Sequence, residues 1–193
     1  MNKIIIFVLF IIILSALAQL SLMFETDWLQ FARADIESGQ WWRFITGNMV
    51  HLTWRHLAMN ILALVAIFAL YSKCLNIHLM ILVFLLSCLS VTLGIWMFSP
   101  QIHWYVGLSG SLHGLLVTLI ILDYVIHKHW LNIVLLLALI AKLAWEGMMG
   151  PIPGSESAAG GPVVVQAHLY GFLGGLTITF CMFIFNKNKK ILV

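Results

Sequence analysis

The stretch Gly107-Leu108-Ser109-Gly110-Ser111-Leu112-His113-Gly114 runs directly into the apolar segment Leu115–Ile126. A helix that begins at Ser109 and ends near Ile126 approaches the ~20 residues that cross the ~30 Å hydrocarbon core of a bilayer. The sequence therefore predicts a membrane-spanning helix that carries a serine at its first residue.

The rest of the chain is also strongly apolar. Of its 193 residues 62% are hydrophobic and only 9% are charged, too few charges to cover the surface of a soluble domain. We predict one membrane domain over residues 1–193, an all-α, six-transmembrane-helix bundle. The first segment resembles a signal peptide in some respects, but nothing downstream resembles a secreted domain, which favours a retained helix. The predicted helices are Ile4–Leu22, His51–Tyr71, Ile77–Phe98, Ser109–Ile126, Leu131–Met148 and Val163–Phe185.

Basic residues predict the orientation of the bundle. They occupy the N-terminus, the second and fourth loops and the C-terminus, positions that share one side of a six-helix protein, and the positive-inside rule places that side in the cytoplasm. Both termini are thus predicted to be cytoplasmic, and the basic tail marks a cytoplasmic end, not a nucleic-acid site. These basic residues are Lys3, Lys73, Lys128, Lys187, Lys189 and Lys190.

The opposite, outer side receives most of the acidic residues and a long first loop, Met23–Val50. Aromatic residues with scattered charges suit a segment that lies in the membrane interface. The aromatic residues of this loop include Trp28, Phe31, Trp41 and Trp42, and the acidic residues are Glu25, Asp27, Asp35, Glu37 and Glu156.

Spacing places a serine and a histidine at one depth. Ser109 lies nineteen residues before Lys128, and His168 lies nineteen residues before Lys187. At 1.5 Å per residue, both lie ~28 Å above the cytoplasmic lysines, in the outer part of the bilayer. Equal depth alone does not bring two helices together, so the two helices must also pack closely against each other.

Glycine pairs on the two helices allow this close packing. Gly110 and Gly114 form one G-x-x-x-G pair, and Gly171 and Gly175 form another, with His168 on the same helical face as the second pair. Such pairs allow two backbones to approach closely in lipid. Packing alone would also explain them, but we expect the packing to bring the serine to the histidine.

The two side chains predict nucleophilic catalysis without a carboxylate. A serine hydroxyl needs a base, and histidine titrates in the useful range. Asp123 lies ~21 Å further in, and Glu146, four residues after Lys142, suggests an intrahelical ion pair. A serine at a helix start is often only an N-cap, whereas an intramembrane histidine is costly and usually functional. We expect a Ser109–His168 dyad and no triad.

Donors for an oxyanion are also available. The backbone N–H of Ser109 is free at a helix start. His56 and Asn60 project from one face of their helix, ~25 and ~20 Å above Lys73, and can supply side-chain donors. We expect His51 to hold the first loop in place and not to be catalytic. These residues lack the carboxylate or thiolate typical of metal sites, so neither a metal nor a cofactor is expected.

Cysteine chemistry is not expected either. The three cysteines lie in or beside apolar runs without C-x-x-C spacing, which favours small apolar fillers over a disulfide or metal site. They are Cys74, Cys88 and Cys181.

Taken in order, four motifs resemble the rhomboid family of intramembrane serine proteases over essentially the whole chain. The resemblance implies Ser109 as nucleophile, His168 as general base, and Ser109 N–H, His56 and Asn60 as the oxyanion hole, with no cofactor. It implies Met23–Val50 as a lateral flank and Gly150–Val165 as a flexible cap. Supporting residues are His51, Gly107, Gly110, His113 and Gly171. The motifs are Trp42-Arg43, His51-x-x-x-x-His56-x-x-x-Asn60, Gly107-Leu108-Ser109-Gly110 and Ala167-His168-x-x-Gly171-x-x-x-Gly175.

One departure points to a branch of that family. Many rhomboids carry an aromatic residue four positions after the nucleophile, where this chain has His113. The Gly-Leu-Ser-Gly-x-Leu-His-Gly pattern resembles the rhombosortase branch, which is proposed to process proteins with a C-terminal Gly-Gly motif, one membrane helix and a basic tail. The sequence leaves three roles open for His113, which would stack on His168, hydrogen-bond to it, or contact substrate. It also leaves open whether the acyl-enzyme is resolved by hydrolysis or by transfer to an amine.

The predicted partners are a transmembrane substrate with a C-terminal anchor and the lipid bilayer, without nucleic acid. The predicted location is the inner (plasma) membrane of a bacterium, with the active site opening to the outer side. A general rhomboid protease of single-span substrates is the main alternative. A second is an inactive rhomboid-like protein that binds transmembrane helices, but such proteins usually lack the serine or the histidine.

Overall fold

The computed structural model describes residues 2–24, 27–74 and 76–185. Glu25 and the tail lysines Lys187, Lys189 and Lys190 lie outside the described residues. The described residues contain six helices long and apolar enough to cross a membrane, which confirms the predicted fold class. These helices are α1 (Asn2–Ser21), α4 (Trp54–Tyr71), α5 (Ile77–Phe98), α6 (Ser109–His127), α7 (Leu131–Met149) and α9 (Val165–Phe185).

Local chemistry sets where the helices begin and end. α4 begins at Trp54 and not at the predicted His51, because the extended Thr53 is its N-cap and the Thr53 hydroxyl accepts a hydrogen bond from the His56 N–H at 3.1 Å. His51 therefore lies outside the helix. α6 begins at Ser109, as predicted, and ends where Lys128 adopts a left-handed conformation with φ of 58°.

The connection between α1 and α4 is a small folded unit. It contains η1 (Leu22–Phe24), β1 (Phe31–Ala32), α2 (Arg33–Glu37) and α3 (Arg43–Thr46), and β1 pairs antiparallel with β2 (Trp104–Tyr105). The Arg33 guanidinium donates to the Ile95, Trp96 and Ser99 carbonyls at 3.0, 3.0 and 3.1 Å. Because these carbonyls end α5, the loop is fastened to the bundle. Phe31 is fully buried, whereas Trp28 and Trp41 are exposed.

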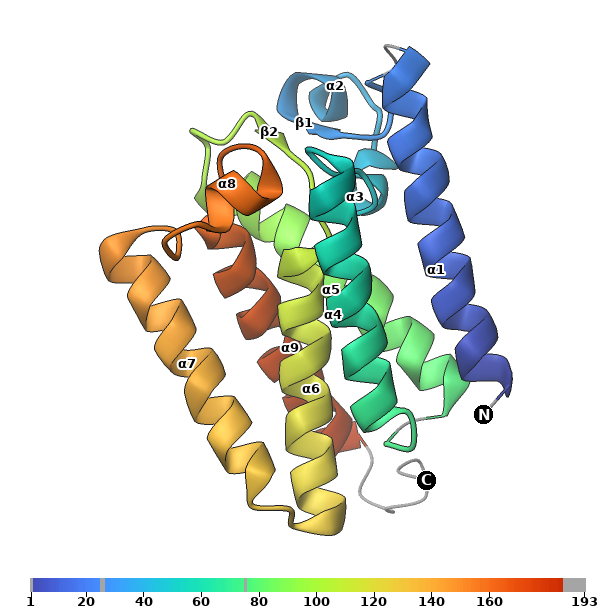
Figure 1. Cartoon of the computed structure of the whole chain (residues 1–193), viewed down its shortest axis with the longest axis vertical. Helices are drawn as coiled ribbons and strands as arrows, with labels where there is room; N and C mark the ends of the chain where they lie inside the picture. The colour runs from blue at the N-terminus through green and yellow to red at the C-terminus, as the bar shows by residue number, and fades with distance from the viewer. Residues whose placement is uncertain (1, 25–26, 75, 186–193) are drawn as a thin grey trace.

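α6 lies in the middle of the bundle beside α9, with α1 and α7 at the two flanks (Figure 1). The closest packing joins α6 to α9, and glycines make it possible. A β-carbon on Gly110 would lie 2.8 Å from the Ala167 carbonyl oxygen, and one on Gly114 would lie 2.6 Å from that of Gly171. There is no room for a side chain at either position. The predicted glycine contact between these two helices is confirmed.

The start of α1 and the end of α9 lie at the same end of the bundle, opposite α2, α3 and α8 (Ser155–Ala159) (Figure 1). This agrees with an even number of spans. Which end faces the cytoplasm stays a prediction from the lysines.

The cysteines follow the predicted role of small apolar fillers only in part, because the Cys74 thiol also donates a hydrogen bond to the Asp123 carboxylate. Cys74 and Cys88 are buried, and all three cysteines are free. Cys181 is exposed on α9, so it does not belong to the core of the bundle.

Candidate active site

The side chains of Ser109 and His168 meet where α6 and α9 begin. The Ser109 Oγ lies 2.9 Å from the His168 Nε2, and the His168 side chain is buried. The glycine contact between the two helices lies directly beside this pair, since Gly110 follows the serine and faces the Ala167 carbonyl. Close backbone packing thus brings the hydroxyl within hydrogen-bond reach of the imidazole, in the arrangement that a nucleophile and its base require.

A carboxylate lies on the other side of the imidazole, which corrects the expectation that no acidic group is near. The His168 Nδ1 lies 2.9 Å from the Glu146 Oε2 and 3.1 Å from its Oε1, and Glu146 is buried. The expectation failed because it assigned Glu146 only to Lys142 on the same helix. In the structure, α7 packs against α9 and turns this carboxylate toward the histidine.

Lys142 lies at the centre of the same polar group. Its Nζ donates to the Glu146 Oε2 at 2.7 Å, which confirms the predicted intrahelical ion pair. The same Nζ lies 2.8 Å from the His113 Nε2 and 2.9 Å from the His168 Nδ1. One ammonium group therefore connects the carboxylate to both imidazoles within a largely apolar span.

His113 stacks on His168, the first of the three roles left open by the sequence. The two ring centroids are 4.4 Å apart and the planes are inclined by 20°. The His113 Nδ1 lies 2.7 Å from the Ser109 carbonyl oxygen, which can only accept, so this nitrogen carries the proton. Its Nε2 is then free to accept from the Lys142 ammonium. His113 is thereby held at both ring nitrogens.

The same logic assigns the proton on His168. Glu146 as a carboxylate can only accept, so Nδ1–H donates to it and Nε2 is left to accept from the Ser109 hydroxyl. This is the tautomer that a general base needs. Lys142 can also donate to Nδ1, which would favour the opposite tautomer. Two Glu146 oxygens lie within 3.1 Å of Nδ1, against one Lys142 nitrogen at 2.9 Å, and on that ground we assign the proton to Nδ1.

His56 and Asn60 lie on α4, His56 beside Gly107 and Asn60 on the wall of the same cavity as Ser109. The His56 ring contacts Gly107, where a β-carbon would lie 3.0 Å from the His56 Cε1 and where φ is +126°. The Asn60 Nδ2 donates to the His56 carbonyl at 3.2 Å. Within the described part of the chain neither side chain hydrogen-bonds to Ser109.

A cavity of about 460 Å³ between α4, α6 and α7 reaches the serine. Its walls are mostly apolar, with small residues such as Ala63, Ala66 and Ala138. The polar groups that line it are Asn60, Ser109, His113 and Lys142. The cavity thus combines an apolar surface that suits a hydrophobic segment with a polar region around the hydroxyl.

The Rhomboid domain family matches residues 38–185, which is more than half of the chain. This chain belongs to the rhomboid family. No curated protein matches the chain. The match and the six apolar helices together show a multi-pass membrane protein in a lipid bilayer.

In this rhomboid protein His51 links α1 to Leu108, the residue before Ser109. It is fully buried, its backbone N–H donates to the Gln19 side chain at 3.0 Å, and its Nε2 accepts from the Leu108 N–H at 3.4 Å. Burial, and secondly the neighbouring His56, lower the pKa of His51 to about 3. The ring is therefore neutral at physiological pH, as its acceptor role requires.

This pKa predicts acid-sensitive folding. The folded-state pKa lies below the unfolded value of about 6.5, so the unfolded chain takes up the proton first as the pH is lowered. The free energy of unfolding therefore decreases as the pH is lowered between these two values. Between pH 7 and pH 5 we expect His51 to remove about 2 kcal/mol from the free energy of unfolding. Thermal unfolding in detergent micelles measures it. His51→Gln should show a shallower pH slope than the native protein, and identical slopes would contradict the assignment.

A cap segment, Gly150–Val165, covers the start of α4. It contains α8, and the Thr53 hydroxyl donates to the Ala159 carbonyl at 2.9 Å. The Val163 N–H donates to the Glu156 side chain at 3.4 Å. The cap predicted from the sequence is thus in contact with the helix that carries His56.

Sequence reasoning missed Glu146 and Lys142 as members of this site. The signal was present, because two ionisable residues at i and i+4 within an apolar span are costly and usually functional.

Proposed function

We propose that the chain is an intramembrane serine protease in which Ser109 attacks a peptide carbonyl and His168 takes its proton. The observation that carries the proposal is the line of contacts from the Ser109 Oγ through His168 to the Glu146 carboxylate, at 2.9 Å on each side of the ring. A hydroxyl, an imidazole and a carboxylate in this order are the groups that acyl transfer uses.

In the first step, the Ser109 Oγ forms a bond to the carbonyl carbon while its proton passes to the His168 Nε2. The charge that develops on the carbonyl oxygen is met by the Ser109 N–H and by donors on His56 and Asn60. Glu146 faces the Nδ1–H of the imidazolium and stabilises its positive charge. The C–N bond then breaks, and the leaving amine takes the proton from Nε2. Water or another amine, activated in the same way, resolves the acyl-enzyme.

Lys142 and His113 have supporting parts in this proposal. The Lys142 ammonium compensates the buried Glu146 charge, since an unpaired carboxylate at this depth is unfavourable. His113 fixes both the Lys142 Nζ and the plane of the His168 ring. His113 and Lys142 thus make polar contacts beside His168 at the place where many rhomboids have a single aromatic ring.

We further propose that the substrate is a membrane-anchored protein with Gly-Gly at the outer end of a C-terminal transmembrane helix, as in the rhombosortase branch. The apolar cavity beside Ser109 suits hydrophobic side chains of such a helix, and Gly-Gly both weakens that helix and fits a crowded site. The predicted setting is a bacterial inner membrane, with Ser109 toward the outer side and the basic loops toward the cytoplasm.

Reconstitution with a model substrate tests this function. We expect cleavage of a single-span substrate that carries Gly-Gly before its C-terminal anchor, and mass spectrometry should find the new C-terminus at or beside the Gly-Gly. A matched substrate with Leu-Leu at the same positions should be cleaved at least ~10-fold more slowly, because bulky residues stiffen the helix and crowd the serine.

The outcomes separate the possibilities. Equal cleavage of the Gly-Gly and Leu-Leu substrates would overturn the Gly-Gly specificity and favour a general rhomboid protease. Binding of both without cleavage would overturn the protease and favour the inactive, helix-binding alternative. A product carrying an added amine would show transfer in place of hydrolysis.

A further inference from the structure

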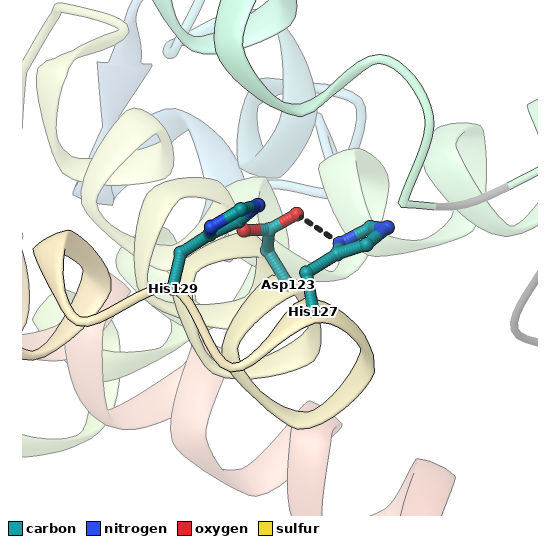
Figure 2. A group of neighbouring side chains, drawn as sticks. All are labelled: Asp123, His127 and His129. Atoms are coloured by element: carbon teal, nitrogen blue, oxygen red, sulfur yellow. Dashed lines mark hydrogen bonds and ion pairs between the residues drawn. The ribbon is translucent and has the colours of Figure 1, made fainter.

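A second group of polar side chains lies at the opposite end of α6 from Ser109. Asp123 and His127 belong to the last turns of α6, and His129 belongs to the short connection to α7. One ligand atom from each of the three lies within 4.8 Å of the others. Figure 2 shows the carboxylate between the two imidazole rings, with His127 on one side and His129 on the other.

The carboxylate is held in place by three different elements. Asp123 is 8% exposed, and its Oδ2 accepts from the Asn132 Nδ2 at 2.6 Å. Its Oδ1 lies 2.8 Å from the His127 Nδ1 and accepts from the Cys74 thiol at 3.3 Å. The Tyr71 hydroxyl in turn donates to the Asn132 Oδ1 at 2.9 Å. Metal-binding carboxylates are characteristically oriented by such outer hydrogen bonds.

The two imidazoles, in contrast, face solvent. The His127 side chain is 42% exposed, and His129 is exposed as well. Their rings stack with centroids 5.6 Å apart and an inclination of 24°. The site therefore has a rigid oxygen ligand at its base, two nitrogen ligands that can adjust, and an open side for entry of an ion and a water molecule.

We propose that Asp123, His127 and His129 bind one divalent transition-metal cation of the zinc class. Two imidazole nitrogens and one carboxylate oxygen suit Zn²⁺ and its neighbours, whereas Mg²⁺ and Ca²⁺ prefer oxygen ligands alone. A water molecule supplies the fourth position. His127 binds through Nδ1 after its proton moves to Nε2, so its hydrogen bond to Asp123 is replaced by coordination of the shared ion.

The site is separate from the proposed proteolysis. Asp123 lies fourteen residues after Ser109 on the same helix, ~21 Å along its axis, so the ion cannot reach the serine. It would join the end of α6 to the connection that leads into α7, at the end that the lysines predict to be cytoplasmic. Asn132, which donates to the Asp123 carboxylate, connects the site to the first turn of α7.

Metal titration of the purified full chain, carrying no polyhistidine tag, tests the proposal. With Co²⁺ as the probe, we expect one equivalent to bind with the visible absorption of a four-coordinate site and to be displaced by Zn²⁺. His129→Ala should weaken Co²⁺ binding at least tenfold, and this exposed residue can be replaced without disturbing the fold. His78→Ala, at an exposed histidine at the same end of the bundle, is the matched control.

Zn²⁺ should also raise the unfolding temperature of the native protein and of His78→Ala, but not of His129→Ala. The proposal is overturned if Co²⁺ binds no more tightly to the native protein than to His129→Ala, or if its spectrum is that of the six-coordinate aqueous ion. The same measurements on Ser109→Ala should match the native protein, so this result is independent of whether the chain is a protease.

Discussion

Ser109→Ala should abolish cleavage of a membrane-anchored substrate, with a fall in rate of order 10⁴–10⁶, because no other atom can form the acyl-enzyme. His168→Ala should cost a similar factor, since the hydroxyl would have no base at 2.9 Å. The two losses should not add, because the residues act as a unit. Cleavage is measured with purified protein in liposomes, with substrate and product separated by electrophoresis.

The control for this pair is Ser157→Ala, the same change at an exposed serine of α8, which should leave the rate unaltered. A serine-reactive phosphonate should label the native protein and not Ser109→Ala, although Ser111 is retained two residues away. Cleavage or labelling that persists in a folded Ser109→Ala preparation would show that the nucleophile lies elsewhere.

Glu146→Gln should lower kcat by ~10²–10⁴ with little change in KM, because a neutral amide neither holds the proton on the His168 Nδ1 nor stabilises the imidazolium. Lys142 would then be the stronger partner of Nδ1, and its donated bond favours the tautomer that cannot accept from Ser109. Glu146→Asp, which keeps the charge on a shorter side chain, should recover part of the loss.

A purely structural role for Glu146 would give a different pattern. It would lower the unfolding temperature without a selective loss of kcat, and Glu146→Asp would offer no catalytic recovery. Glu156→Gln removes an exposed carboxylate from the cap segment and is the matched control, for which we expect no change in kcat. Full activity of Glu146→Gln would return the mechanism to the Ser109–His168 dyad expected from the sequence.

The sequence carried enough information to place Ser109 beside His168, because depth in a membrane can be counted along a helix and glycine pairs mark where backbones touch. It did not place Glu146, because counting gives height along an axis but not the rotation of one helix toward another. Lys142, four residues before Glu146, already offered an ion-pair partner for that carboxylate. The second contact of the carboxylate, with His168 on α9, depends on how the two helices pack.

The same limit applies to His113 and to the first loop. The sequence placed His113 one turn below the serine, but stacking depends on side-chain torsions that spacing does not determine. The loop was expected to lie in the interface because of its tryptophans. Its folding onto α5 depends on Arg33, a long side chain that reaches backbone carbonyls more than sixty residues away.

The two hydrogen bonds of the Thr53 hydroxyl connect the start of α4 to the cap segment. Its hydroxyl accepts from the His56 N–H and donates to the Ala159 carbonyl, so one oxygen links α4 to the cap segment. A single hydrogen bond of this kind contributes about 1 kcal/mol, which alters an equilibrium about fivefold. The Thr53 hydroxyl thus contributes only this much to holding the cap segment against the helix that carries His56.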